Sequence, residues 1–271
     1  MPSEVDHISL EPLFNKGYNK TTGGIRVQDP MLELASGLIP GHSCINKFGR
    51  SSAITTTNTW EIWDGNAAYS FPATALMTHI SQTTNQAALQ GGTIEVQGLD
   101  ANWALVFQDV DLDGTNTETP VALATPLIRA FRMKIQENVV GSSPIRLHNA
   151  AENQDYAVIS TGNNQTLMAI YTVPDDKTAF VTNYYGTANP GGGAPTRFDI
   201  RLWARDNENG YEKQLKHMLG VSADLDAYGH FQHIFKPYYK FTKKTDVFLT
   251  GSPTGASVDT SAGFDLILVD N

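Results

Sequence analysis

The feature that most constrains this fold is a two-residue alternation of apolar and polar side chains in several short segments. Successive side chains of a β-strand point to opposite faces, so this period predicts strands that bury one face. Residues 94–99 alternate in this way, while residues 103–108 and 264–270 predict more continuously buried strands. In residues 129–136 and 197–205, the side chains predicted to be buried are Phe131, Met133 and Ile135, and Phe198, Ile200, Leu202 and Ala204.

Helical patterns are scarce in this chain. A short helix is expected around residues 31–36, and residues 210–219 fit a helix or a strand equally well. Short strands recur with turn-forming residues between them, and no alternation of strands with helices is present. The sequence therefore predicts a mostly β fold with two β-sandwich or jelly-roll-like domains and an extended N-terminal arm, and 271 residues suffice for two such cores.

The domain organisation is predicted from changes in composition. Residues 1–50 are rich in Gly and Pro and lack the apolar period needed to fold alone, so they predict the N-terminal arm. Such arms need an anchor; this arm either wraps its own domain or docks on a neighbouring subunit, and we favour docking. A Gly-Ser-Ser-Pro stretch at residues 141–144 sets the boundary between a β domain over 51–137 and a β-sandwich domain over 138–271.

Charge and cysteine content narrow the choice of partners. The net charge is -9, which disfavours a nucleic-acid partner. The one concentrated basic stretch, residues 236–244, is explained by lysines that protect a β-sheet edge. Cys44 is the only cysteine, so an intrachain disulfide and a cysteine zinc cluster are excluded. The opening residues resemble no secretory signal and no apolar run suits a membrane helix, so we expect a soluble protein made in a reducing cytoplasm.

Three segments carry a resemblance to a known class of protein. Residues 61–65 read EIWDG, residues 69–72 read YSFP, and residues 163–181 read NNQTLMAIYTVPDDKTAFV, with a polar turn at 174–177 between two strands. These segments resemble structural proteins of tailed-bacteriophage virions from marine and freshwater phages, in which a Trp-Asp-Gly segment comes early and a Tyr-x-Val-Pro-x-x-Lys-Thr-Ala hairpin opens the second half. The resemblance covers about residues 46–271. It implies a particle-building protein, and its motifs specify no chemistry.

Signatures of catalysis do not assemble in the sequence. Residues 251–255 keep both glycines of a hydrolase nucleophile elbow but have Pro253 where the nucleophile belongs. Residues 191–195 lack the Lys-Ser/Thr ending of a phosphate-binding loop. The His-Ser-Cys run at 42–44 has no orienting acid beside it. We therefore expect neither enzyme activity nor a cofactor.

Two clusters are candidate metal sites. Asp109, Asp111 and Asp113, followed by Gly114, match the first half of a calcium loop, but the acid required at its twelfth position is missing. A hairpin that turns at residues 113–114 explains these aspartates better than a weak calcium site. His230 and His233 would lie on opposite faces of a strand and could not bind one metal together.

Exposed aromatic and basic residues are the predicted contact surface. The outer row of the 197–205 strand and the 238–244 stretch are hypothetical interface elements, and they contain Arg197, Asp199, Arg201, Trp203, Arg205, Tyr238, Tyr239, Lys240, Lys243 and Lys244. The four tryptophans raise a second reading, because carbohydrate-binding sandwiches present flat aromatic faces. Indoles are more often core or interface anchors. Among them, Trp203 fits that second reading best because it lies in a polar row.

The function predicted from the sequence is a non-enzymatic virion structural protein of a tailed phage. It would be made in the host bacterial cytoplasm, form homo-oligomers, and contact other virion proteins of the capsid, neck or tail. Nucleic acid and membrane are not expected partners. The main alternative is a receptor- or glycan-binding module at a tail fibre, with a host glycan as partner. A third reading is a jelly-roll shell protein.

Overall fold

The structure is a computed structural model that describes residues 18–19, 24–25, 30–190, 196–223, 229–255 and 257–271. Strands account for 57% of it and helices for 4%, so the predicted mostly β fold is confirmed. The chain forms two compact units, Met1–Cys44 and Ile45–Asn271. Within the described parts of the chain, no helix has the length and apolar character that crossing a bilayer requires.

The first unit contains the helix predicted at residues 31–36. Gly37 ends this helix with a φ of 68°, and the amide of Leu38 donates to the carbonyl oxygen of Glu33, as in a Schellman cap. Half of the predicted arm lies outside the described residues, and its docking on a neighbouring subunit stays a prediction. The described elements are β1 (Tyr18–Asn19), β2 (Gly24–Ile25) and α3 (Pro30–Ala35).

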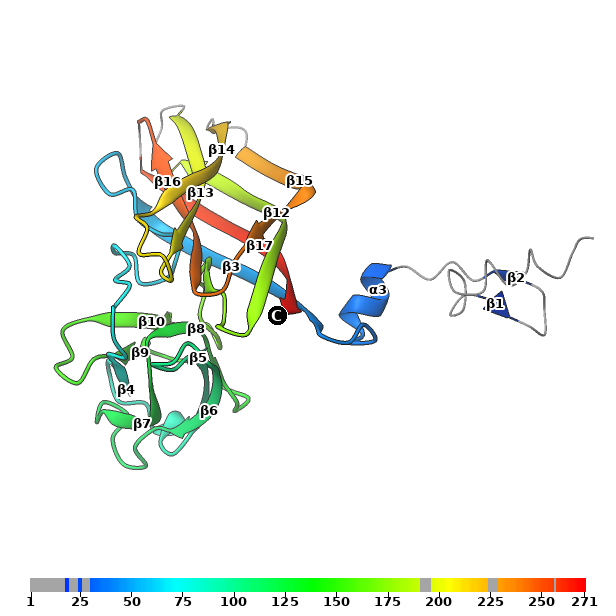
Figure 1. The fold of residues 1–271 in the computed structure, drawn as a ribbon. Coiled ribbons are helices and arrows are strands. Elements are labelled where there is room, and N and C mark those ends of the chain that lie inside the picture. Colours follow the sequence, from blue (N-terminus) through cyan, green and yellow to red (C-terminus); the bar gives the residue numbers. More distant parts are fainter. Residues whose placement is uncertain (1–17, 20–23, 26–29, 191–195, 224–228, 256) are drawn as a thin grey trace, which may run out of the picture. The chain divides into compact units, whose positions relative to one another are not determined.

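Two four-stranded sheets form a sandwich, in the orders β11-β16-β13-β14 and β15-β12-β17-β3 (Figure 1). Their inward side chains share one core that includes Tyr184, Phe198 and Phe264, and the side chains predicted to be buried in residues 197–205 are buried. The strands are β3 (His42–Ile54), β11 (Ile170–Thr172), β12 (Lys177–Pro190), β13 (Thr196–Asp206), β14 (Gln214–Ala223), β15 (Gly229–Phe241), β16 (Thr245–Pro253) and β17 (Val258–Asp270).

Between β3 and β11 the chain builds a second lobe, which we call the insert lobe. It has two antiparallel sheets, β10-β9-β4-β7 and β6-β5-β8 (Figure 1). Phe131, Met133 and Ile135 are buried as predicted. The elements are β4 (Met77–Gln82), η1 (Ala87–Leu89), β5 (Thr93–Leu99), β6 (Leu105–Asp111), β7 (Val121–Leu127), β8 (Arg129–Ile135), β9 (Ile145–His148) and β10 (Asp155–Ile159).

The sandwich and the insert lobe exchange core residues. Leu99 and Phe131 come from insert-lobe strands but belong to the sandwich core. In the opposite direction, Phe248 of β16 belongs to the insert-lobe core. Burial of each lobe's side chains in the other couples them into one folding unit, because separation would return these apolar surfaces to water.

The sheets divide the chain differently from the predicted domains. β9 and β10 lie beyond the expected boundary at residues 138–144, yet β9 pairs with β4 of the insert lobe. β3, which begins inside the predicted 1–50 arm, lies beside β17 in the sandwich. Loops inside a domain and linkers between domains share the same Gly, Ser and Pro content, so composition alone does not separate them.

Three local expectations have different outcomes. The turn at residues 174–177 does not close a hairpin, because β11 pairs with β16 while β12 pairs with β15 and β17. The expected buried run at 103–108 is wrong: β6 is an edge strand, and Leu105 and Phe107 are 40% and 61% exposed. For residues 210–219, the strand alternative holds for the part that forms β14.

Candidate interaction surface

The predicted outer row of β13 is divided between two environments. At one end of the row, Arg205 lies over the ring of Phe71 at 4.3 Å, and Trp203 packs against the insert-lobe core. The Trp203 indole N–H also donates to the Thr250 hydroxyl at 2.9 Å. Trp203 and Arg205 therefore contact the insert lobe of the same chain.

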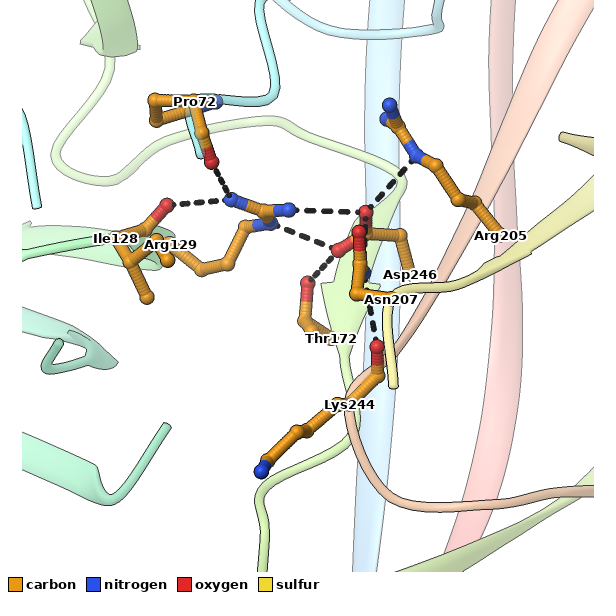
Figure 2. A network of polar contacts seen from close by, with 8 residues as sticks. All are labelled: Pro72, Ile128, Arg129, Thr172, Arg205, Asn207, Lys244 and Asp246. Atoms are coloured by element: carbon orange, nitrogen blue, oxygen red, sulfur yellow. Dashed lines mark hydrogen bonds and ion pairs between the residues drawn. The ribbon is translucent and has the colours of Figure 1, made fainter. Parts of the chain in front are cut away.

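A buried ion pair lies between the two lobes (Figure 2). The Arg129 guanidinium of β8 donates to both carboxylate oxygens of Asp246 in β16, at 2.8 and 3.1 Å. Their side chains are 3% and 0% exposed. Arg129 also donates to the carbonyl oxygens of Pro72 and Ile128, at 2.6 and 2.8 Å. These contacts match the planar, fixed donor geometry of an arginine.

The Asp246 carboxylate has further partners (Figure 2). It accepts hydrogen bonds from the Thr172 hydroxyl at 2.6 Å and the Asn207 amide at 2.9 Å, and Arg205 lies 3.3 Å away as a second cation. The Arg129 guanidinium lies over the Trp103 ring at 5.0 Å. Such complete partnering is what a buried charge pair requires.

The segments that carry the phage resemblance build this junction and its surroundings. Trp63 stacks edge-on against Tyr69 at 5.2 Å, and Tyr69 contacts Phe71 at 4.7 Å. A Cβ at Gly65 would come 2.1 Å from the Trp63 ring, so glycine leaves the space that the indole fills. The resembled motifs therefore have packing roles in this fold.

The other end of the β13 row forms a surface with β14, which we call the β13–β14 outer face; Asp199 within it is 8% exposed. Asp199 lies between two arginines, 3.0 Å from Arg197 and 3.6 Å from Arg201. On β14, Met218 pairs with Arg201 and is 41% exposed, and Leu215, which pairs with Trp203, is 47% exposed. This face combines arginine with exposed apolar side chains.

The other predicted interface element, residues 238–244, also divides into side chains that pair within the chain and side chains that do not. Lys243 forms ion pairs with Asp175 and Glu208, and Lys244 pairs with Asp175. Surface pairs of this kind contribute little energy but occupy the ammonium groups. The remaining candidates of this stretch lie on β15, an edge strand; they are Tyr238, which is 46% exposed, and Tyr239 and Lys240, which line a surface groove.

The edges of the two sheets meet at a histidine pair. The rings of His217 in β14 and His233 in β15 stack with centroids 4.0 Å apart, and the Tyr184 hydroxyl lies 2.6 Å from His217 Nδ1. Burial, and then the charge of His233, lower the pKa of His217. His230 pairs with Thr187 and is exposed, so the prediction that His230 and His233 lie on opposite faces is confirmed.

Acidification is expected to destabilise the sandwich through His217. Because its pKa is lower in the folded chain than the usual value of about 6.5, the unfolded chain binds more protons below that pH. The free energy of unfolding should therefore fall as the pH drops below about 6.5. Urea unfolding at a series of pH values should show a smaller decrease for His217→Gln, whereas the exposed control His230→Gln should follow the wild type. Equal pH profiles for His217→Gln and wild type would contradict this role.

The three aspartates of the candidate calcium site have separate protein partners. Asp109 accepts from the Gln136 amide at 2.6 Å, and Asp111 from the Thr93 hydroxyl at 2.7 Å. Asp113 accepts from the Thr115 amide and hydroxyl, which lowers its pKa. Residues 113–114 lie in the connection from β6 to β7, which occupy different sheets, so the expected tight hairpin is not formed. Among the described residues, no three His, Cys, Asp or Glu side chains group as metal ligands.

Sequence reasoning missed the Arg129–Asp246 pair and the His217–His233 stack. Asp246 precedes the apolar run 247–249, and an acid at the end of a buried strand indicates a buried partner. Arg129 lies two residues before Phe131, so both side chains point to the inward face of β8. For the histidines, which come from different sheets, no such local signal exists.

Comparisons with known proteins assign no family. No family model matches the chain, and no curated protein matches it. A CBM22–GH10 xylanase 10B from Clostridium thermocellum, complexed with xylohexaose, is 10% identical with a TM-score of 0.21, over 72% of this chain and 28% of that one. The Cry1Da tryptic core variant of Bacillus thuringiensis is 8% identical with a TM-score of 0.23, over 79% and 53%.

A third solved structure, that of infectious bursal disease virus Gt strain, is 9% identical with a TM-score of 0.23, over 89% of this chain and 78% of that one. This chain thus spans about a quarter to a half of the first two structures, whose coverage is 28% and 53%. At these scores the likenesses assign neither a class nor an activity.

Proposed function

We propose that this chain is a non-enzymatic structural protein of a tailed-phage virion, which contacts other virion proteins of the capsid, neck or tail. The observation that carries the proposal is the β13–β14 outer face, where Arg197 and Arg201 flank Asp199 and Met218 and Leu215 are exposed on the neighbouring strand β14. Arginine and methionine are enriched at protein–protein interfaces, and apolar side chains form their cores.

The lobe junction supports a mechanical role. Exchange of core residues and a buried ion pair hold the two lobes in one arrangement. A protein that repeats the same contacts many times in an assembly benefits from a rigid body, since a rigid partner loses less entropy on binding. The resembled segments around Trp63 and Phe71 lie at this junction, so the phage resemblance and the rigidity concern the same residues.

The first test is the presence and position of the chain in intact particles. We expect imaging of virions to show its two-lobed density in repeated copies. In reassembly with purified particles, Met218→Asp should lower occupancy by roughly tenfold or more, because it places a charge in an apolar contact. The matched control is Phe107→Asp, an exposed apolar side chain on β6 of the insert lobe.

Two results would count against the assembly role. The chain could be missing from purified particles, or Met218→Asp could attach with the same occupancy as the wild type. A selective loss with Phe107→Asp would move the contact surface to the insert lobe and would contradict the role proposed for the β13–β14 outer face.

Receptor or glycan binding is the second candidate function. The observation that favours it is a groove lined by Tyr211 and Tyr239, beside Gln214 and Asp206. Aromatic faces next to amide and carboxylate groups are the chemistry that holds sugars. Trp203, the tryptophan that the sequence favours for this role, instead packs against the insert-lobe core.

A further inference from the structure

A second groove, which we call the outer groove, lies on the face of the β15-β12-β17-β3 sheet that points away from the sandwich core. Its volume is about 390 Å³, within the range of roughly 300–1,000 Å³ typical of binding sites. It is hollow because two short, exposed side chains, Thr187 and Ser261, pair across β12 and β17 at its centre. Its apolar walls are Phe48, Leu167 and Tyr185.

The Tyr185 wall of the outer groove is held in place before any partner arrives. Its hydroxyl oxygen accepts from the Asn46 amide at 3.0 Å. Tyr185 pairs with Gly263 of β17, where a Cβ would come 2.7 Å from the tyrosine hydroxyl oxygen. Glycine therefore leaves the ring room to lie across the strand. A wall that is already ordered loses little entropy when a partner binds.

The helix α3 carries apolar side chains that its own unit does not cover. Of residues 30–44, only Leu34 is buried, whereas Leu32 and Leu38 are 65% and 58% exposed. The Schellman cap at Gly37 places Leu38 back over the last turn of the helix, next to Leu32. The two leucines therefore form one apolar projection, and covering it would remove apolar surface from water.

The charges around the leucine pair and around the outer groove are complementary. Glu33, the acid of α3, directly follows Leu32. At the groove, the Arg50 guanidinium uses Nε and Nη2 on Asp259 and, within the described part of the chain, has Nη1 left for another acceptor. His230 is exposed at the same groove. Opposite charges beside an apolar contact fix the orientation in which it forms.

The chain between α3 and the outer groove is too compact for α3 to fill the groove of its own chain. The amide of Leu38 donates to the Glu33 carbonyl oxygen, and that of His42 to the Ile39 carbonyl oxygen. Phe48 lies six residues beyond His42 in β3, about 20 Å at the rise of a strand. The connection from α3 to β3 would cover that distance only when nearly fully extended, without these hydrogen bonds. A second copy can supply α3 with no such loss.

We propose that α3 of one copy docks in the outer groove of a second copy, with Leu32 and Leu38 against Phe48, Leu167 and Tyr185. The proposal gives the predicted arm a specific docking site and does not depend on the virion role. Copies that exchange α3 reciprocally form a closed dimer, whereas copies that each pass it to the next form a ring or a filament.

The test is sedimentation velocity of the purified full chain from about 1 to 100 μM, where the wild type should associate. The α3 variant is Leu32→Asp/Leu38→Asp, which charges the apolar projection. The groove variant is Ser261→Phe, which fills the hollow from an exposed position; Thr187→Phe fills it independently from β12. Each variant should weaken association by roughly tenfold or more.

Mixing the variants identifies a second copy as the occupant. The α3 variant keeps an intact groove, and the groove variant keeps an intact α3. A 1:1 mixture should therefore form a two-chain species more tightly than either variant does alone. An α3 that binds the groove of its own chain would give a monomeric wild type and no pairing in the mixture, and the proposal would be wrong.

Matched controls separate this contact from general effects of charge and bulk. Leu76→Asp changes a leucine of the insert lobe that is 46% exposed, and Ser222→Phe changes an exposed serine of β14. Both should associate like the wild type, and all variants should keep the wild-type melting temperature. Unchanged association of the α3 variant or of both groove variants would overturn the proposal. Loss of association in Ser222→Phe alone would place the contact between copies on the β13–β14 outer face and would overturn it as well.

Discussion

Replacing Asp246 with alanine is expected to destabilise the fold by about 3–5 kcal/mol, because it leaves the Arg129 guanidinium buried without its counter-ion. Arg129 is 3% exposed and has no route to water while the two lobes stay packed. Nε and Nη2 of Arg129 would lose their carboxylate acceptors, and only Nη1 would keep partners, the carbonyl oxygens of Pro72 and Ile128. The measurement is the free energy of unfolding from urea titration.

A surface pair with similar geometry is the control for this prediction. Arg50 donates to both oxygens of Asp259, at 3.2 and 2.7 Å, but the two side chains are 52% and 34% exposed. Asp259→Ala should therefore cost at most about 1 kcal/mol. Similar losses for the buried and the exposed pair would contradict the role assigned to burial.

A double variant separates the strength of the pair from the cost of an unpaired charge. Arg129→Met combined with Asp246→Leu removes both charges, and replacement of a buried pair by apolar residues is often neutral. We expect this variant to recover most of the stability lost in Asp246→Ala. An additive loss in the double variant would show that the two side chains do not act as a pair.

The sequence predicted the strands well where the evidence was local. The faces of β8 and β13 followed from the alternation around Phe131 and Ile200, because the side chains of a strand alternate whatever the strand pairs with. The evidence for helix α3 was equally local, since its C-terminal cap needs only Gly37 and its neighbours.

Partner choice between strands could not be read from the sequence in this way. The turn after β11 has the composition of a hairpin, yet it carries the chain from one sheet of the sandwich to the other. Arg129 and Asp246 are 117 residues apart, and which strands bring them together depends on the entire fold. The same holds for the groove between β14 and β15, because Gln214 and Tyr239 come from different sheets and line it together only when the edges of the two sheets face each other.

The second large expected effect is a pH dependence of the free energy of unfolding, which comes from a buried lysine. Lys47 of β3 is 5% exposed, and its ammonium donates to the carbonyl oxygen of Phe131 in β8. Burial, and then the charge of Arg132, lower the pKa of Lys47 to about 7. Between pH 7 and about 10, the unfolded chain therefore binds a proton that the folded chain releases.

The free energy of unfolding should consequently rise with pH across this window. A lysine with a carboxylate partner would give the opposite pH dependence. One pKa unit corresponds to about 1.4 kcal/mol, so the gain from pH 7 to pH 10 is on the order of 4 kcal/mol. Above about pH 10 the rise should stop. Burial raises the pKa of Tyr69 and Tyr171 in the folded chain, so these tyrosines ionise first in the unfolded chain, which favours unfolding.

Lys47→Met is the variant that tests this assignment. It removes the buried charge and leaves the Phe131 carbonyl without its donor, a cost of about 1–3 kcal/mol. We expect its free energy of unfolding to be nearly independent of pH between 7 and 10. The exposed control Lys134→Met should keep the wild-type rise. If wild type and Lys47→Met have parallel profiles over this range, Lys47 is charged in the folded chain. The ammonium would then have to reach water or a carboxylate, and the packing of β3 against β8 would differ from that described above.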